Sequence, residues 1–113
     1  PTTNDADEKN FNVDFKNVDV VLHTGFGYKG RNVLSVRACD AVIVVNGRFG
    51  TLSELANAEG EGKPIVVIKN TGGCADIAEN IFKALNPSYK NFVVASSAQE
   101  AVNFIEKMLK SKA

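Results

Sequence analysis

The sequence predicts an α/β fold of three layers, in which helices cover both faces of a parallel sheet. A chain of 113 residues is long enough for one domain with one hydrophobic core. Its longest apolar runs are rich in β-branched residues and nearly continuous, which is typical of strands buried on both faces. Segments with helical spacing separate these runs, so strand and helix alternate, and parallel strands joined by right-handed crossovers are the simplest arrangement.

The N-terminal segment does not share this alternation. Residues 1–17 are polar and acidic, with Phe11, Val13 and Phe15 scattered among them, and we interpret them as a polar connector. Residues 18–113 form the predicted domain. Because the sequence opens at Pro1 without an initiator Met, we also expect this chain to be a segment of a longer domain.

Four strands are predicted from runs of Val, Ile and other apolar residues. They cover residues 18–24, 40–45, 64–69 and, in a shorter run, 92–95. The predicted helices cover residues 30–39, 51–61, 74–85 and 98–110. In the last helix the apolar residues fall on one face, which is the pattern of a helix packed on a sheet. With so few strands, we expect one edge of the sheet to be bare unless a preceding segment or a partner subunit covers it.

Glycine and proline mark where two of the helices end. Gly60 and Gly62 fit a helix end just before Pro64, because glycine adopts the left-handed conformation that follows a last helical turn. Asn86 and Pro87 stop the next helix, because proline lacks an N–H group and disfavours helix in the residue before it.

Composition excludes several function classes. The 13 basic and 13 acidic residues cancel, so the chain offers no basic field for nucleic acid or for a membrane surface. No apolar stretch approaches the roughly 20 residues of a membrane span, and the first residues given lack the basic and apolar regions of a secretory signal, so we expect a cytoplasmic protein. Cys39 and Cys74 are far apart and His23 is isolated, which predicts reduced thiols and no metal site.

Glycine-rich loops follow the first three predicted strands, and they are the strongest functional signal. Parallel strands would bring these loops to one edge of the sheet, where free amides at helix starts favour anions. The candidate ligand-binding or phosphate-binding residues are Gly25, Gly27, Asn32, Gly47, Arg48, Gly50, Thr51, Thr71, Gly72 and Gly73.

The first loop only partly matches a dinucleotide fingerprint. Residues 25–30 have the spacing Gly-x-Gly-x-x-Gly between a predicted strand and a predicted helix. The acidic residue expected at the end of the next strand is absent, since that strand ends in Val45 and Asn46. Arg31, in the predicted first turn, opposes the helix dipole unless an anionic ligand is bound. The alternative, a surface Arg whose stem packs on the helix, stays open.

The second loop leads into Thr51-Leu52-Ser53-Glu54, which has the pattern of a capping box. From spacing alone we put this structural role of Thr51 and Glu54 first. Glu54 would nevertheless lie at the same edge of the sheet as Arg31, so a carboxylate and a guanidinium could face a shared ligand. Such a carboxylate can accept a proton, orient a water or stabilise an oxocarbenium-like centre.

Three stretches, residues 25–32, 38–45 and 46–54, resemble the SLOG superfamily of Rossmann-like proteins. This group includes the LOG cytokinin-activating phosphoribohydrolases and the molybdenum cofactor carrier proteins. The resemblance covers about residues 18–110, and its most specific part is the stretch that ends in Gly-Thr-Leu-Ser-Glu. It implies a Rossmann-like parallel sheet with helices on both faces. We expect the domain to be partial, because the N-terminal strands of the family and their phosphate loop have no counterpart in this sequence.

The resemblance also implies roles for individual residues. Arg31 and Glu54 fall on the catalytic positions of the LOG enzymes, which cleave the N-glycosidic bond of nucleoside 5′-monophosphates while the Gly-Thr loop holds the phosphate. Asn32 replaces a Lys of that family, Asn46 a Pro, and Arg48 a Gly of the phosphate loop. With these departures the sequence looks closer to the carrier-like branch of the superfamily than to the LOG enzymes. Arg48 would either clash with the ligand pose of the family or clamp a phosphate.

Three functional hypotheses follow. The first is a homodimer or higher homo-oligomer that binds a small phosphate-bearing ligand, either a nucleotide or the molybdenum cofactor, and requires no other cofactor. The second is a phosphoribohydrolase that acts on nucleoside 5′-monophosphates, and the third is an inactive fragment of such a domain. None of the three involves a nucleic-acid or membrane partner.

Overall fold

The structure is a computed structural model that describes residues 27–111, with side chains from residue 32 onward. The predicted connector at residues 1–17, the predicted strand at residues 18–24 and Gly25 lie outside the described residues. None of the helices in residues 27–111 has the length and apolar character that crossing a bilayer requires.

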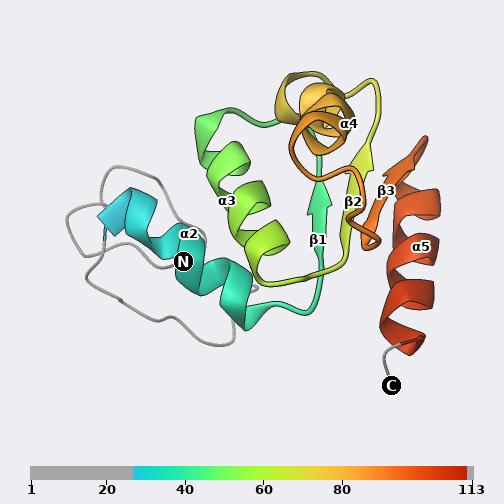
Figure 1. Ribbon diagram of the computed structural model, residues 1–113, viewed down its shortest axis with the longest axis horizontal. Coiled ribbons are helices and arrows are strands. Elements are labelled where there is room, and N and C mark those ends of the chain that lie inside the picture. The colour runs from blue at the N-terminus through green and yellow to red at the C-terminus, as the bar shows by residue number, and fades with distance from the viewer. Residues whose placement is uncertain (1–26, 112–113) are drawn as a thin grey trace, which may run out of the picture.

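Helix and strand alternate along the described chain, as predicted (Figure 1). The elements are α2 (Gly27–Ala38), β1 (Val42–Val44), α3 (Phe49–Gly60), β2 (Ile65–Ile68), α4 (Gly73–Leu85), β3 (Phe92–Ala95) and α5 (Ala98–Lys110). The predicted bounds of β3 and α5 are confirmed to the residue. In contrast, α2 begins three residues before the predicted start at Gly30 and α3 begins two residues before Thr51, so both predicted helix starts are corrected.

The three strands form a parallel sheet in the order β1-β2-β3. Val44 lies opposite Val67, which in turn lies opposite Val94, so the strands end at nearly the same level. The carboxyl ends of all three strands therefore meet at one edge, which confirms the predicted parallel α/β architecture.

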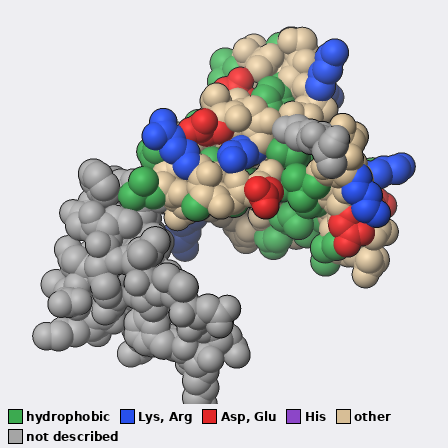
Figure 2. All heavy atoms as spheres, turned by 90° about the horizontal axis from the view of Figure 1, so that it is seen from below, with side chains coloured by type: hydrophobic (Ala, Val, Ile, Leu, Met, Phe, Trp, Pro, Cys, Tyr) green, Lys and Arg blue, Asp and Glu red, His purple; other side chains and the backbone are tan. Residues whose placement is uncertain are grey.

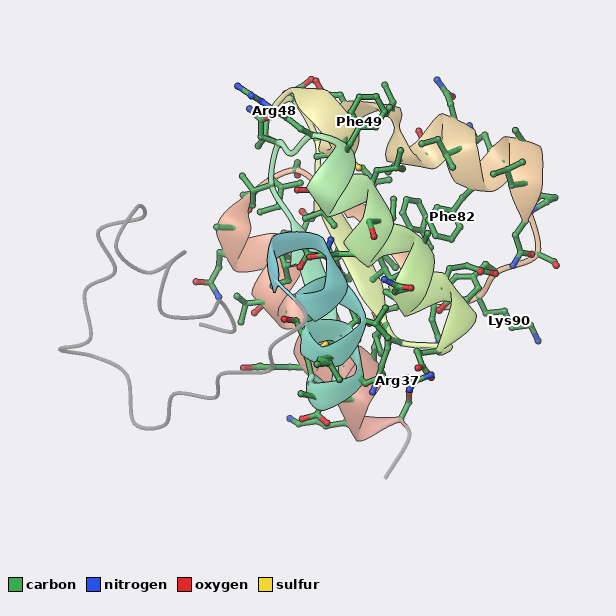
Figure 3. All side chains as sticks on the ribbon, turned by 90° about the vertical axis from the view of Figure 1, so that its left-hand side faces the viewer. Arg37, Arg48, Phe49, Phe82 and Lys90 are labelled. Atoms are coloured by element: carbon green, nitrogen blue, oxygen red, sulfur yellow. The ribbon has the colours of Figure 1, made fainter. Side chains whose placement is uncertain are left out.

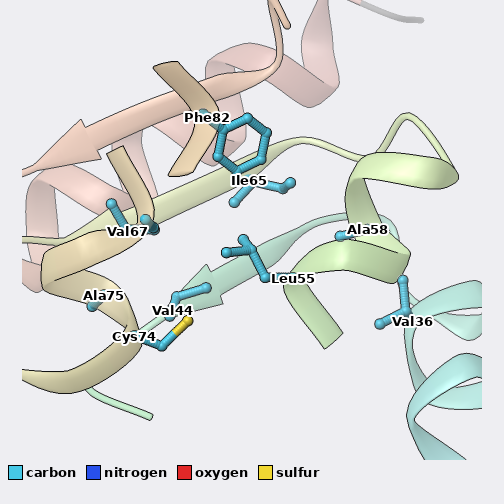
Figure 4. Close-up of a cluster of buried hydrophobic side chains, with 10 residues drawn as sticks. Val36, Val44, Leu55, Ala58, Ile65, Val67, Cys74, Ala75 and Phe82 are labelled. Carbon is cyan, nitrogen blue, oxygen red and sulfur yellow. The ribbon is translucent and has the colours of Figure 1, made fainter. Parts of the chain in front are cut away.

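Helices cover both faces of this sheet, and α3 and α5 lie on opposite sides of the strands (Figure 1). Neighbouring residues of a strand point to opposite faces, so Val67 packs in the core below α3 and α4, whereas Val66 packs against α5. Figure 4 shows that Val36 of α2 and Leu55 of α3 join the first of these cores. Acidic and basic side chains are interspersed on the face in Figure 2.

Local hydrogen bonds explain how α3 ends. Gly62 has a φ of 70°, and the chain closes with bonds from the Gly62 N–H to the Glu59 carbonyl and from the Lys63 N–H to the Ala58 carbonyl, both 3.0 Å. This is the glycine-terminated helix end predicted from the sequence. The end of α4 at Leu85, one residue before Asn86, agrees with the predicted stop at Pro87.

The start of α5 carries a pair of hydrogen bonds similar to a capping box, which the sequence analysis did not identify. The Ser97 hydroxyl accepts a hydrogen bond from the Glu100 N–H at 3.1 Å, and the Glu100 carboxylate accepts one from the Ser96 N–H, also at 3.1 Å. The sequence pattern Ser-x-x-Glu is the signal that was missed.

Candidate functional site

The loops that follow β1 and β2 contact each other at the carboxyl edge of the sheet. The Asn46 N–H donates to the Thr71 hydroxyl oxygen at 2.9 Å, and that hydroxyl donates to the Ile68 carbonyl at 2.7 Å. Two of the three glycine-rich loops are therefore side by side, as the parallel sheet predicted.

The first amides of α4 are already hydrogen-bonded. The Cys74 N–H donates to the Gly47 carbonyl at 2.8 Å, and the Ala75 N–H donates to the Asn46 carbonyl at 3.0 Å. Backbone carbonyls of the β1–α3 loop thus cap α4, in the place where the sequence analysis expected free donors for a ligand. A ligand role for Thr71, Gly72 and Gly73 stays a prediction.

Close packing of these loops requires glycine at two positions. A Cβ atom at Gly73, whose φ is 54°, would collide with the carbonyl oxygen of Gly47. A Cβ atom at Gly47, whose φ is 104°, would lie 2.5 Å from the side chain of Thr51. Backbone conformation and close contacts therefore require glycine at both positions, whether or not a ligand binds there.

The start of α3, in contrast, is open. Arg48 is the N-cap residue in extended backbone, its side chain makes no capping hydrogen bond, and the first helical bond is the one from the Leu52 N–H to the Arg48 carbonyl at 2.9 Å. The amides of Phe49, Gly50 and Thr51 have no acceptor within the described part of the chain. No acidic side chain lies in the first turn of α3.

The predicted capping box at Thr51 and Glu54 is therefore wrong. Asn46 adopts a left-handed conformation with a φ of 54°, which turns the chain immediately after β1 and lets α3 begin at Phe49. Thr51 becomes the third residue of the helix, and Glu54 lies in the second turn. In residues 32–111 the Glu54 carboxylate has no hydrogen-bond or ion-pair partner.

Helix α2 lies beside α3 and carries two of the predicted site residues. Asn32 is only 7% exposed, and its Nδ2 atom lies 3.5 Å from the Gly50 carbonyl oxygen, so it faces the first turn of α3. Glu54 is four residues after Gly50 and shares this side of α3. Arg31 precedes Asn32 and lies in the second turn of α2, one turn later than predicted. Its charge is therefore farther from the positive end of the helix dipole, so the dipole gives less reason to expect an anionic ligand beside Arg31. The Arg31 side chain is outside the described part.

A groove of about 500 Å³ opens at the starts of α3 and α4. It is lined mainly by apolar side chains, among them Phe49, Leu52 and Ile77, with the charged residues Arg48 and Asp76. Figure 3 shows Arg48 extending outward at the start of α3. The sequence analysis did not identify Ile77, because its exposure depends on how α4 packs.

The two cysteines and the acidic residues of the described part were compared with the requirements of nucleophilic and metal sites. Burial raises the pKa of the Cys74 thiol, which disfavours its nucleophilic thiolate. The Cys39 thiol donates to the Val36 carbonyl at 3.0 Å. Among the residues that the structure describes, no three His, Cys, Asp or Glu side chains gather as metal ligands would.

Comparison with known proteins places these observations in context. The model of the SLOG cluster4 family matches residues 1–102. The X-ray structure of TM1055, a structural genomics target, is 29% identical with a TM-score of 0.67, and the match covers 79% of this chain and 55% of that one. An uncharacterized protein of Archaeoglobus fulgidus is 43% identical over 51 residues, which are 45% of this chain and 33% of that protein. The chain thus spans between a third and about half of the length of these relatives.

Proposed function

This chain belongs to the SLOG cluster4 family, and on that premise we propose that it binds a phosphate-bearing nucleotide or nucleotide-derived cofactor at the start of α3. The observation that carries the proposal is the set of three amides at Phe49, Gly50 and Thr51, which have no acceptor among residues 27–111. They lie at the carboxyl edge of a parallel sheet, which is where open α/β folds bind their ligands.

The surroundings of these amides support an anion. Three N–H groups at a helix start carry the positive end of the helix dipole, and each can donate to a phosphate oxygen. A Cβ atom added at Gly50 would meet no atom of the described part of the chain within 4 Å, so that part leaves space beside the first turn of α3. Arg48 supplies a guanidinium at the rim of the groove.

The amides of α4 are not part of this proposal. Because the Asn46 and Gly47 carbonyls already bind them, a phosphate there would have to displace two backbone hydrogen bonds. The proposed site therefore uses the loop that leads into α3, and not all three glycine-rich loops expected from the sequence.

A ligand series tests the proposal. AMP should raise the unfolding temperature, whereas adenosine, which lacks the phosphate, should not, because a ligand selective for the folded state stabilises it. A shift with adenosine equal to that with AMP would contradict phosphate recognition, and no shift with either would contradict nucleotide monophosphate binding.

A matched pair of variants locates the phosphate. Phe49→Pro removes one amide donor at the first helical position, which tolerates proline and follows an extended residue, whereas Phe49→Ala removes only the ring. The Pro variant should bind AMP about tenfold more weakly than the Ala variant, since a hydrogen bond to a charged group contributes about 1.5–3 kcal/mol. Equal affinities would place the phosphate elsewhere.

The second candidate function is hydrolysis of the N-glycosidic bond of a nucleoside 5′-monophosphate. It is favoured by the carboxylate of Glu54, which has no hydrogen-bond or ion-pair partner among the side chains of residues 32–111 and lies on the same side of α3 as Gly50, whose carbonyl faces Asn32 of α2. A carboxylate in that position would orient water or stabilise positive charge on the ribose.

Incubation with AMP separates the two candidates. Release of adenine that is lost in Glu54→Gln would establish the hydrolase. AMP binding without any release of adenine would exclude the hydrolase for this nucleotide and leave the binding function intact.

A further inference from the structure

Asn46 and Gly47 form the turn between β1 and α3, and they are the one Asn-Gly pair of the sequence. Asn46 is exposed and has a φ of 54°, and Gly47 has a φ of 104°. The carbonyls of this turn accept the first amides of α4, beside the end of β1 (Figure 1). The backbone of the turn is therefore fixed by bonds in which the Asn46 side-chain amide takes no part.

The side-chain amide of Asn46 lies against the backbone nitrogen of Gly47. The Gly47 N–H donates to the Asn46 Oδ1 atom at 2.6 Å, so the carbon Cγ that carries this oxygen is held close to the Gly47 nitrogen. Within residues 27–111 no backbone carbonyl competes for this N–H. Because Gly47 has no Cβ atom, its own side chain does not hinder the approach of its nitrogen to Cγ. The two atoms are therefore close enough in space to join in a five-membered ring.

The oxygen and the nitrogen of the Asn46 amide have surroundings that favour the same reaction. A Cβ atom added at Gly73, the first residue of α4, would lie 2.5 Å from Asn46 Oδ1, so this oxygen is beside the positive end of the α4 dipole. Negative charge that develops on Oδ1 is stabilised there. The Nδ2 atom faces Gly72 and donates no hydrogen bond to the described residues, so none holds it in place.

We propose that Asn46 is a site of covalent modification, at which the folded chain converts this side chain to an aspartyl or isoaspartyl residue. The Gly47 nitrogen forms a bond to Cγ and loses its proton, the Cγ–Nδ2 bond breaks, and the amine takes up a proton and leaves as ammonia. A water molecule then opens the cyclic imide. Opening at Cγ gives Asp, and opening at the backbone carbonyl carbon gives isoaspartate, so water is consumed and nothing is oxidised.

The conversion changes the charge of the turn and, in the isoaspartyl product, its backbone. Either product adds one negative charge to a chain whose formal net charge is zero. In the isoaspartyl product the main chain runs through Cβ and Cγ, so the carbonyl that accepts from the Ala75 N–H becomes a carboxylate outside the main chain. Gly47 packs against Thr51 in the first turn of α3. A carboxylate next to Gly47 should therefore weaken AMP binding, a consequence that rests on the proposed function.

Asn70 is a matched control within the same chain. Like Asn46, it is exposed, has a positive φ, here 65°, and is the second residue after a strand of the sheet. It is followed by Thr71 and not by glycine, and in the described residues no hydrogen bond joins its side chain to the Thr71 N–H. Asn70 therefore shares the place of Asn46 in the fold without its contact to the next nitrogen.

Peptide mass spectrometry of the folded protein tests the proposal. Trypsin releases residues 38–48, in which Asn46 is the one side-chain amide, and residues 70–83, in which fragment ions separate Asn70 from Asn80. After incubation near neutral pH, residues 38–48 should gain the mass that replacement of an amide by an acid gives. The gain at Asn46 should be about tenfold faster than at Asn70 or more, which corresponds to a barrier lower by about 1.4 kcal/mol.

Asn46→Asp is the reference for the product. On anion exchange the incubated protein should develop an acidic species that elutes with this variant, and the variant itself should develop none at this position. The variant should also bind AMP about tenfold more weakly than the unaltered chain. Because the conversion is measured by mass and charge, a lack of AMP binding by both proteins would contradict the proposed function and not the modification.

The proposal is overturned if residues 38–48 keep their mass while the protein stays folded, or if Asn70 gains mass as fast as Asn46. It is also overturned if the conversion occurs only after unfolding in urea, because the fold would then protect the pair.

Discussion

Replacing Gly50 by Asp should stabilise the fold and weaken phosphate binding at the same time. Gly50 is the second residue of α3, its surroundings have room for a side chain, and no acidic residue lies in this first turn. An Asp there would occupy the positive end of the helix dipole, which contributes about 0.3–1 kcal/mol. It would also remove a flexible glycine, which contributes a further few tenths of a kcal/mol.

The expected gain of roughly 0.5–1.5 kcal/mol corresponds to a rise of about 3–8 °C in the unfolding temperature of a domain of this size. The same carboxylate would lie where we propose the phosphate, so AMP affinity should fall by about tenfold or more, equivalent to about 1.4 kcal/mol. Gly50→Asn has nearly the same size without the charge and should keep most of the affinity.

Thermal unfolding and calorimetric titration with AMP, applied to both Gly50 variants, measure the two effects. Undiminished AMP binding by Gly50→Asp would refute the placement of the phosphate at the start of α3. A lower unfolding temperature of Gly50→Asp than of Gly50→Asn would refute the open helix start itself.

Three further predictions concern the fold. Gly73→Ala should destabilise the protein by about 2 kcal/mol or more in chemical denaturation, because its left-handed backbone and its contact with the neighbouring loop exclude a Cβ atom; an unchanged midpoint would contradict the loop geometry. Tyr89→Phe should cost about 1 kcal/mol near neutral pH, since the hydroxyl donates to the Lys63 carbonyl at 2.7 Å. Burial, and to a smaller extent Glu59, raises the pKa of the Tyr89 phenol above 10.0, so folding favours its neutral form. The contribution of this phenol to the stability of the fold is therefore complete below pH 10 and is lost as the pH rises through its pKa in the folded protein. The stability of the Phe variant should lack this pH dependence. Of the two thiols, that of Cys74 should react more slowly with a disulfide reagent in the folded protein, because it is buried and its pKa is raised; faster labelling of Cys74 than of Cys39 would show that the start of α4 opens.

Much of the fold was predictable because its signals are local. The strand Ile65–Ile68 is an apolar run with its first three residues fully buried. Pro87 marks one helix end because it disfavours the helical conformation, and Gly62 marks another because it adopts a left-handed one. The parallel order of the strands follows from the crossover helices, and with it the meeting of the loops after β1 and β2.

The start of α3 was not predictable in the same way. Asn46 reaches a left-handed conformation that Asn adopts in only a minority of positions, and this moves the helix start away from a plausible cap at Thr51. The hydrogen bonds from α4 to the Asn46 and Gly47 carbonyls join residues almost thirty positions apart, so no local pattern indicates them. The exposure of Phe49 likewise depends on tertiary packing.

The capping of α4 by carbonyls of the β1–α3 loop ties two crossover units together mechanically. Loop and helix cannot separate without leaving the Cys74 and Ala75 amides unpaired in a buried turn, so neither unit opens on its own. A displacement of the loop that precedes α3 would therefore also move the start of α4.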